Sequence, residues 1–302
     1  MGFFRLQLGL LLGFGVGIFL WLGWPSSAVA EPVAPARVEH FAEGTSWAGG
    51  DIQTALDYFN HQVVDHPDSA AAFGHRGLIE VELGDYGPAI ADCNRAIELD
   101  RHNPDYRLTR GVALYRSGDY QAALQDDDWV LANHPQDYRG YYNRGLVNIA
   151  LHDFAAAIDD FDWAVTLAIG TDPNPLADIY DDRGLAKLMA AQPEAAISDF
   201  TQALALNNED IRALFNRGCA CHQMGRWGDA LADLNQVLAI APDHARTYLK
   251  RGLLRQALGD EAGAIADLHQ AADCAQAQEQ SHLHHHILTV LNTWQTPSSS
   301  MG

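Results

Sequence analysis

The sequence predicts an all-α protein, a solenoid of about seven helical hairpins followed by a C-terminal capping helix. The first observation behind this prediction is an Arg-Gly pair that recurs at residues 76–77, 110–111, 144–145, 183–184, 217–218 and 251–252. The second is an alanine twelve residues after each of these glycines, followed every time by isoleucine or leucine. The period is 34 residues, except that "IGTDPNP" lengthens one interval to 39. A pattern that returns at a fixed period indicates a repeat array.

Each unit is expected to form two helices joined by a tight reversal. In residues 70–103 the first helix has apolar residues at helical spacing. The second helix has an apolar stripe at Ala89, Ile90, Cys93 and Ile97. Gly84-Asp85 permits the turn between them, and Gly77 allows close contact. One such hairpin cannot bury its own apolar face, so the units must stack.

The segment "AAAFGHRGLIEVELGDYGPAIADCNRAIELD" resembles the tetratricopeptide repeat in its order of aromatic, glycine and alanine positions. This resemblance implies a right-handed superhelical solenoid over residues 36–278, with the capping helix and a disordered tail in 279–302. The expected repeats are 36–69, 70–103, 104–137, 138–176, 177–210, 211–244 and 245–278. Two units depart from the pattern at the turn, where they have His152 and Ala191.

The first thirty residues differ in kind from the repeats. One positive charge at Arg5 precedes an apolar stretch from Leu8 to Trp24, and Ala28-Val29-Ala30 follows Pro25. This order is typical of a cleaved signal peptide, with Glu31 as the first mature residue. The alternative is an uncleaved membrane anchor, because the stretch is just long enough to span a bilayer. Either reading predicts export, into a bacterial periplasm or a thylakoid-type lumen, with any membrane contact limited to this segment.

An ion pair is expected within each unit. Six units have an aspartate three residues after the repeated alanine, and the first unit lacks both this aspartate and the arginine. The predicted pairs join Arg76 to Asp92, Arg110 to Asp126, Arg144 to Asp160, Arg183 to Asp199, Arg217 to Asp233 and Arg251 to Asp267. The alternative is that both groups are solvated, since exposed pairs contribute little.

The resemblance also implies a concave groove, lined by the first helices, that binds a peptide or a partner helix. The apolar positions expected there are Leu78, Leu108, Val112, Tyr115, Tyr142, Leu146, Ile149, Leu185, Leu188, Phe215, Leu249 and Leu253. Arg139, Arg212 and Arg246 are expected along the edges. Such a strip suits an amphipathic or extended apolar segment. The alternative is that part of the strip packs between neighbouring first helices.

Three further features have open interpretations. Trp129 and Trp163 occupy equivalent places in successive units and form either an exposed convex patch or ordinary packing. Asp127 replaces an apolar stripe residue, so either the helix rotates or the side chain pairs with Arg110 or Arg144. His282, His285 and His286 in "SHLHHH" are weak metal candidates, which a polar helix face explains equally well.

The composition excludes some functions. Among 302 residues, 39 Asp and Glu stand against 19 Lys and Arg, giving a formal charge of −20, which disfavours nucleic-acid binding. Phosphate-loop, H-E-x-x-H and G-x-S-x-G motifs do not occur in the sequence, so neither catalysis nor a cofactor is expected. The sequence therefore predicts a non-enzymatic scaffold or assembly factor whose partner is an exported or membrane protein. The alternative is metal handling through the histidine-rich C-terminus.

Overall fold

The computed structural model describes residues 52–169 and 173–295, and these residues form fourteen helices without a strand. The helices are α2 (Ile52–Asp65), α3 (Ala70–Leu83), α4 (Tyr86–Leu99), α5 (Pro104–Ser117), α6 (Tyr120–Asn133), α7 (Tyr138–Ala150), α8 (Phe154–Ala168), α9 (Pro173–Met189), α10 (Pro193–Leu206), α11 (Ile211–Gln223), α12 (Trp227–Ile240), α13 (Ala245–Ala257), α14 (Glu261–Ala277) and α15 (Ser281–Gln295). The predicted all-α solenoid is confirmed. Helices α3 to α14 form six hairpins, and α2 is the second helix of the first unit.

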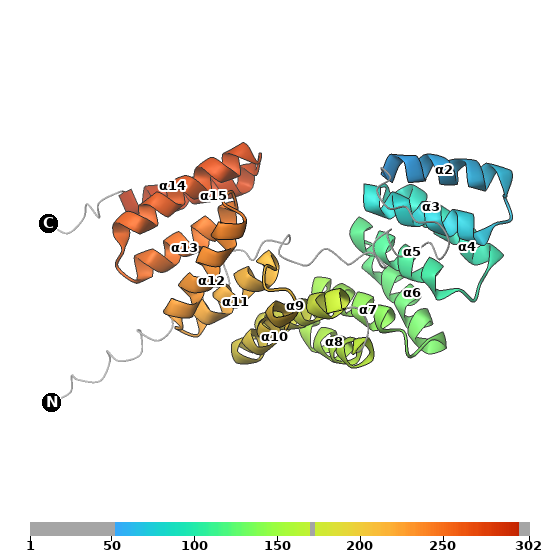
Figure 1. The fold of residues 1–302 in the computed structure, drawn as a ribbon, viewed down its shortest axis with the longest axis horizontal. Coiled ribbons are helices and arrows are strands. Elements are labelled where there is room, and N and C mark those ends of the chain that lie inside the picture. Colours follow the sequence, from blue (N-terminus) through green and yellow to red (C-terminus); the bar gives the residue numbers. More distant parts are fainter. Residues whose placement is uncertain (1–51, 170–172, 296–302) are drawn as a thin grey trace, which may run out of the picture.

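The hairpins follow one another along a broad arc (Figure 1). Each first helix contacts the first helix of the next unit, from α3 and α5 through to α11 and α13, while second helices contact mainly the first helices on either side of them. In Figure 1, α7 and α9 accordingly lie on the inner side of the arc and α8 and α10 on its outer side. We call the surface of the odd-numbered helices α3 to α13 the inner face, and that of the even-numbered helices α4 to α14 the outer face.

The turns within the hairpins share one geometry. Gly84 follows α3 with a φ of 82°, and its N–H donates to the carbonyl of Val81, which ends the helix in a left-handed residue. His152 and Ala191 take the same conformation with φ values of 63° and 58°. These two turns therefore keep their shape without glycine, although a side chain disfavours it.

The two helices of a unit pack closely because the repeated glycine has no side chain. A Cβ atom on Gly77 would lie 3.0 Å from Cys93 Sγ and 3.2 Å from the carbonyl oxygen of Ala89. In later units Phe161 and Phe200 fill the place of Cys93 and are fully buried. At the C-terminal end, α15 covers α14 with buried Ile287 and Leu291. The predicted capping helix is thus present.

The expected signal peptide, its cleavage site and the first helix of the first unit lie outside the described residues. Within residues 52–169 and 173–295, no helix is both long and apolar enough to cross a membrane.

Candidate protein-binding surface

The predicted leucine-lined groove is not open. On the inner face most of the expected strip is buried, because neighbouring first helices pack directly against one another: Leu78, Leu108, Val112, Tyr142, Leu146, Ile149, Leu185, Leu188 and Leu249. Leu146 and Leu185, the central pair, are 0% and 1% exposed. The prediction of an accessible strip at these positions is wrong, since they form the core between units.

Part of the strip remains accessible. Tyr115 on α5 is half-buried, and so are Phe215 on α11 and Leu253 on α13. Cys219 lies one turn after Phe215 on the same side of α11 and is also half-buried. The C-terminal part of the inner face therefore offers apolar groups that a partner could contact.

The two first helices of this region are rich in basic residues, in contrast to the acidic chain as a whole. Helices α11 and α13 contain six lysine and arginine residues and no aspartate or glutamate: Arg212, Arg217, Arg246, Lys250, Arg251 and Arg255. Four of these arginines pair with aspartates of neighbouring helices. Arg246 and Lys250 are half-exposed, and Arg246 borders an open pocket of about 200 Å³ together with His244 and Gln280. We call the surface formed by Phe215, Cys219, Arg246, Lys250 and Leu253 the basic inner surface.

The other two predicted edge arginines are held within the fold. Arg139 donates to Asp137 and lies 2.9 Å from an oxygen of Asp105 in the preceding unit. Arg212 Nη2 donates to Asp181 at 2.7 Å and to Asp182 at 2.9 Å. Both arginines are therefore structural links between first helices as well as groups on the edge of the inner face.

Arg212 belongs to a buried polar network that joins three units. Asp181 and Asp182 on α9 are fully buried, and the Tyr142 hydroxyl on α7 donates to Asp182 at 2.6 Å. Asn216 on α11 donates to Asp181. Burial raises the pKa of both aspartates, while Arg212 acts in the opposite direction. Sequence reasoning missed this network, although Asp-Asp before the Arg-Gly pair occurs only in this unit.

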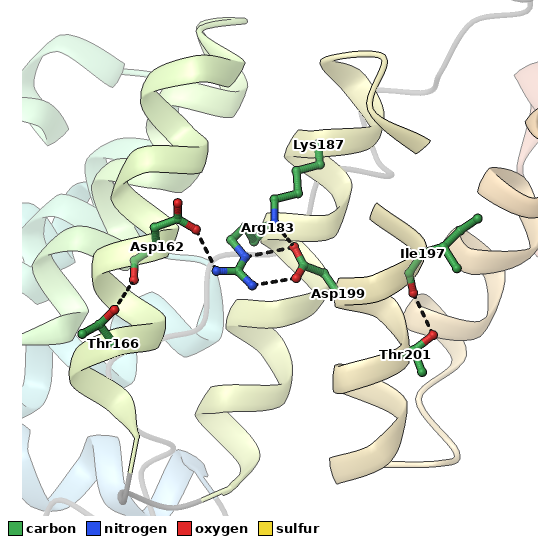
Figure 2. A network of polar contacts seen from close by, with 7 residues as sticks. All are labelled: Asp162, Thr166, Arg183, Lys187, Ile197, Asp199 and Thr201. Carbon is green, nitrogen blue, oxygen red and sulfur yellow. Dashed lines mark hydrogen bonds and ion pairs between the residues drawn. The ribbon is translucent and has the colours of Figure 1, made fainter. Parts of the chain in front are cut away.

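The six predicted arginine–aspartate pairs are all confirmed. In each unit the guanidinium donates two hydrogen bonds to the aspartate of the second helix, as Arg183 does to Asp199 at 2.9 and 2.6 Å (Figure 2). The other pairs have the same partners as predicted. Because these aspartates are buried and the arginines half-buried, such pairs matter more than exposed ones.

Each of these arginines also reaches the preceding unit, which the sequence did not suggest. The third nitrogen donates to a polar side chain two residues after the preceding unit's aspartate position: Asn60, Asn94, Asp128, Asp162, Thr201 and Asn235. Figure 2 shows Arg183 between Asp162 of one unit and Asp199 of its own. The repeated arginine is therefore a link between hairpins as well as within one.

Asp127 pairs with neither candidate arginine. Its side chain is 1% exposed, and neither carboxyl oxygen has a hydrogen-bond partner. It lines a cavity of about 10 Å³ with Gly111, Tyr115 and Asn143. Burial raises its pKa well above that of an ordinary aspartate, so the neutral acid is favoured.

The two tryptophans on the outer face have different surroundings. Trp129 on α6 is half-buried, with the guanidinium carbon of Arg107 3.6 Å from its ring centre. Trp163 on α8 is 56% exposed and stacks beside Tyr141, with ring centres 6.0 Å apart. Packing therefore accounts for Trp129, while Trp163 is an exposed aromatic group.

The C-terminal histidines do not converge. His282 and His285 are exposed on α15, and His286 is half-buried. Throughout the described ranges, no three His, Cys, Asp or Glu side chains are placed to hold a metal ion.

Known proteins resemble about a third of this chain. The Protein SGT1 homolog of Bos taurus is 29% identical over 100 residues, which are 33% of this chain and 30% of that protein. Serine/threonine-protein phosphatase 5 of Rattus norvegicus is 30% identical over 120 residues, 35% of this chain and 24% of its own length. The chain spans about a quarter to a third of these curated relatives, so no phosphatase activity follows from the match.

The solved structure of a tetratricopeptide repeat protein from Parabacteroides merdae has the same fold. Its TM-score is 0.60 at 20% identity, and the match covers 79% of this chain and 93% of the other. Two family models of the tetratricopeptide repeat match residues 46–104 and 108–171, and residues 211–244, which together are about half of the chain. Proteins built from this repeat generally mediate protein–protein interactions. The chain belongs to the tetratricopeptide repeat family.

Proposed function

We propose that this protein is a non-enzymatic scaffold or assembly factor that binds a segment of another protein on the basic inner surface. The observation that supports this most is the combination of half-buried Phe215 and Leu253 with Arg246 and Lys250, next to the open pocket. Apolar contacts would supply most of the affinity, and the cations would select the partner.

The chemistry of the surface favours a partner segment with acidic and apolar residues. Helices α11 and α13 contribute no carboxylate, so an acidic side chain would approach without repulsion from these two helices. The rest of this acidic chain would repel such a segment, which directs it to this place.

We further propose that the partner is an exported or membrane protein. The support is the order of Arg5, apolar stretch and Ala28-Val29-Ala30 at the N-terminus, which is that of a signal peptide. N-terminal sequencing of the exported protein should give Glu31 as the first residue. Recovery of the intact N-terminus in the membrane fraction would indicate an anchor instead.

Charge reversal tests the binding surface. Affinity capture from the native envelope should lose its bound protein, with at least about tenfold weaker binding, in the Arg246→Glu/Lys250→Glu variant. The matched control is Arg95→Glu/Arg101→Glu, which makes the same change in net charge at exposed sites on α4 and in the loop after it. Equal losses of binding in both variants would mean that the net charge of the chain, and not the basic inner surface, determines capture. Undiminished capture by the first variant, with its helical circular dichroism intact, would place the binding site elsewhere.

A further inference from the structure

The outer face has an aromatic side chain that the fold leaves more than half uncovered. Trp163 on α8 is 56% exposed, although one side of its ring stacks beside Tyr141 at an interplanar angle of 24°. Indole is the aromatic ring that attracts cations most strongly. An exposed tryptophan on a repeat array is therefore a candidate contact for a charged partner.

In the preceding unit, the equivalent tryptophan has an arginine stacked on its ring. Trp129 and Trp163 are 34 residues apart, and so are Arg107 and Tyr141. In the earlier unit the Arg107 guanidinium lies over the indole, 3.6 Å from the ring centre. In the later unit Tyr141 replaces that arginine, so Trp163 stacks beside a neutral ring instead of a guanidinium.

The surroundings of Trp163 are acidic. Asp159 lies one turn earlier on the same side of α8 and is exposed, and the adjacent Asp162 is 55% exposed even while it pairs with Arg183. Asp159 and Asp162 are the exposed aspartates of α8, and this helix contains no lysine or arginine. At the position of Asp162, the units at either end of the array have neutral residues, such as Asn94, Thr201 and Asn235. Two exposed carboxylates, those of Asp159 and Asp162, therefore lie beside the exposed ring.

We propose that Trp163, Asp159 and Asp162 form a second docking site, on the outer face, for an arginine- or lysine-bearing segment of a partner protein. The cationic group stacks on the free side of the indole, as Arg107 does on Trp129, and the two carboxylates attract it and accept its hydrogen bonds. This site differs in position and in charge preference from the basic inner surface, so one solenoid can hold a basic segment outside and an acidic segment inside.

The test measures binding of a short peptide of alternating arginine and serine to the full protein by titration calorimetry. Trp163→Ala should weaken binding at least about fivefold, which corresponds to about 1 kcal/mol. Trp227→Ala is the matched control, because Trp227 is another exposed tryptophan, 41% accessible, on α12. Asp159→Asn/Asp162→Asn should weaken binding and reduce its salt dependence.

A second variant separates binding from folding. Tyr141→Arg recreates the arrangement of Arg107 and Trp129, so a guanidinium on the other side of the indole should repel the incoming cation and lower peptide affinity without loss of helicity. Wild-type affinity in both Trp163→Ala and Tyr141→Arg would overturn the proposal, as would equal losses in Trp163→Ala and Trp227→Ala. Concentration-dependent self-association abolished by Trp163→Ala would also overturn it, because the occupant would then be a second copy of the chain.

Discussion

Asp127 occupies a position that the other units fill with Cys93, Phe161, Phe200 or Leu234, all of them buried. Its two oxygens have no partner, and a buried polar group without one costs about 1–3 kcal/mol. The fold tolerates this because the carboxyl group can remain protonated, since burial raises its pKa. The unit formed by α5 and α6 is accordingly expected to be less stable than its neighbours.

Replacement of Asp127 by leucine should stabilise the solenoid by about 1–3 kcal/mol, because it removes the unsatisfied group. The gain should grow as pH rises from the ordinary aspartate value towards neutrality. Over that range the unfolded chain releases a proton that the folded chain retains, which lowers the stability of the wild type alone. Urea denaturation at several pH values measures this. Gln125→Leu, at an exposed site on the same helix, is the control, and a destabilised Asp127→Leu protein would contradict the account.

Glu80 is a second residue that destabilises the unit in which it lies. At its place in other repeats, Asn148, Lys187 and Arg255 each approach the paired aspartate as hydrogen-bond donors or cations. Glu80 instead faces Asp92, and one of its oxygens is buried without a partner. Burial, with a smaller effect of Asp92, raises the pKa of Glu80 to about 7.

Glu80→Gln should therefore flatten the pH dependence of stability. The wild type loses stability as pH rises from the unfolded value of 4.5 to about 7, because Glu80 ionises in the unfolded chain first. Above that range the variant should be more stable by about 1 kcal/mol, an amount that allows for solvent screening at a partly open site. Thermal melts at pH 5 and pH 8 test this, and parallel pH profiles for the two proteins would refute it.

At the scale of the element, the arginine of each first helix has two kinds of partner. Arg144 Nη2 donates to Asp160 at 2.7 Å within its unit, and Nη1 donates to Asp128 of the preceding unit at 2.8 Å. Asp160 is 6% exposed at its side chain, whereas Asp128 is 62% exposed. The buried pair of Arg144 and Asp160 should therefore contribute more to stability than the exposed pair of Arg144 and Asp128.

A double-mutant cycle with Arg144→Gln and Asp160→Asn should give a coupling energy of about 0.5–2 kcal/mol, because the pair is largely buried. The matched cycle with Asp128→Asn should give less than about 1 kcal/mol, because water screens the exposed carboxylate. Equilibrium unfolding supplies both values. Additive effects of Arg144→Gln and Asp160→Asn would mean that the pair does not couple the two helices.

The turn after α9 carries a left-handed alanine at Ala191, where four other units have glycine. Ala191→Gly should stabilise the protein by about 0.5–1 kcal/mol, since the relief of the backbone penalty exceeds the extra freedom of glycine when unfolded. Ala190→Gly, one residue earlier, should instead destabilise by a similar amount, about 0.5–1 kcal/mol. Thermal melts of both variants check this, and changes of the same sign would contradict it.

Periodicity was sufficient to predict the helices, the turns and the six ion pairs, because each depends on contacts that recur with every unit. It was not sufficient to predict which apolar residues stay accessible. Leu146 and Phe215 both fit the groove pattern, yet only the approach of neighbouring first helices decides that Leu146 is buried. Periodicity did not predict the network of Asp181 and Asp182 for a related reason, since their partners Tyr142 and Arg212 lie in other units.

At the scale of the molecule, charge is distributed unevenly over the arc. The acidic excess of the chain is prominent on the second helices around Trp163, while the inner face of α11 and α13 has only basic residues among its ionised groups. A solenoid with two such surfaces can bring together segments of opposite charge. The rigidity that this requires comes from the buried first-helix contacts and from the arginines that link each hairpin to the one before.

The measurement that tests the central claim most directly is site-specific photocrosslinking in cells of the native organism. A photoreactive phenylalanine analogue replaces Gln256, which is exposed one turn after Leu253 on the same side of α13. The matched position is Gln202, exposed on α10 at the outer face. We expect a discrete protein adduct from position 256 that disappears in the Arg246→Glu/Lys250→Glu background. An adduct that survives that double change, or no adduct at 256 while 202 gives one, would contradict binding on the basic inner surface.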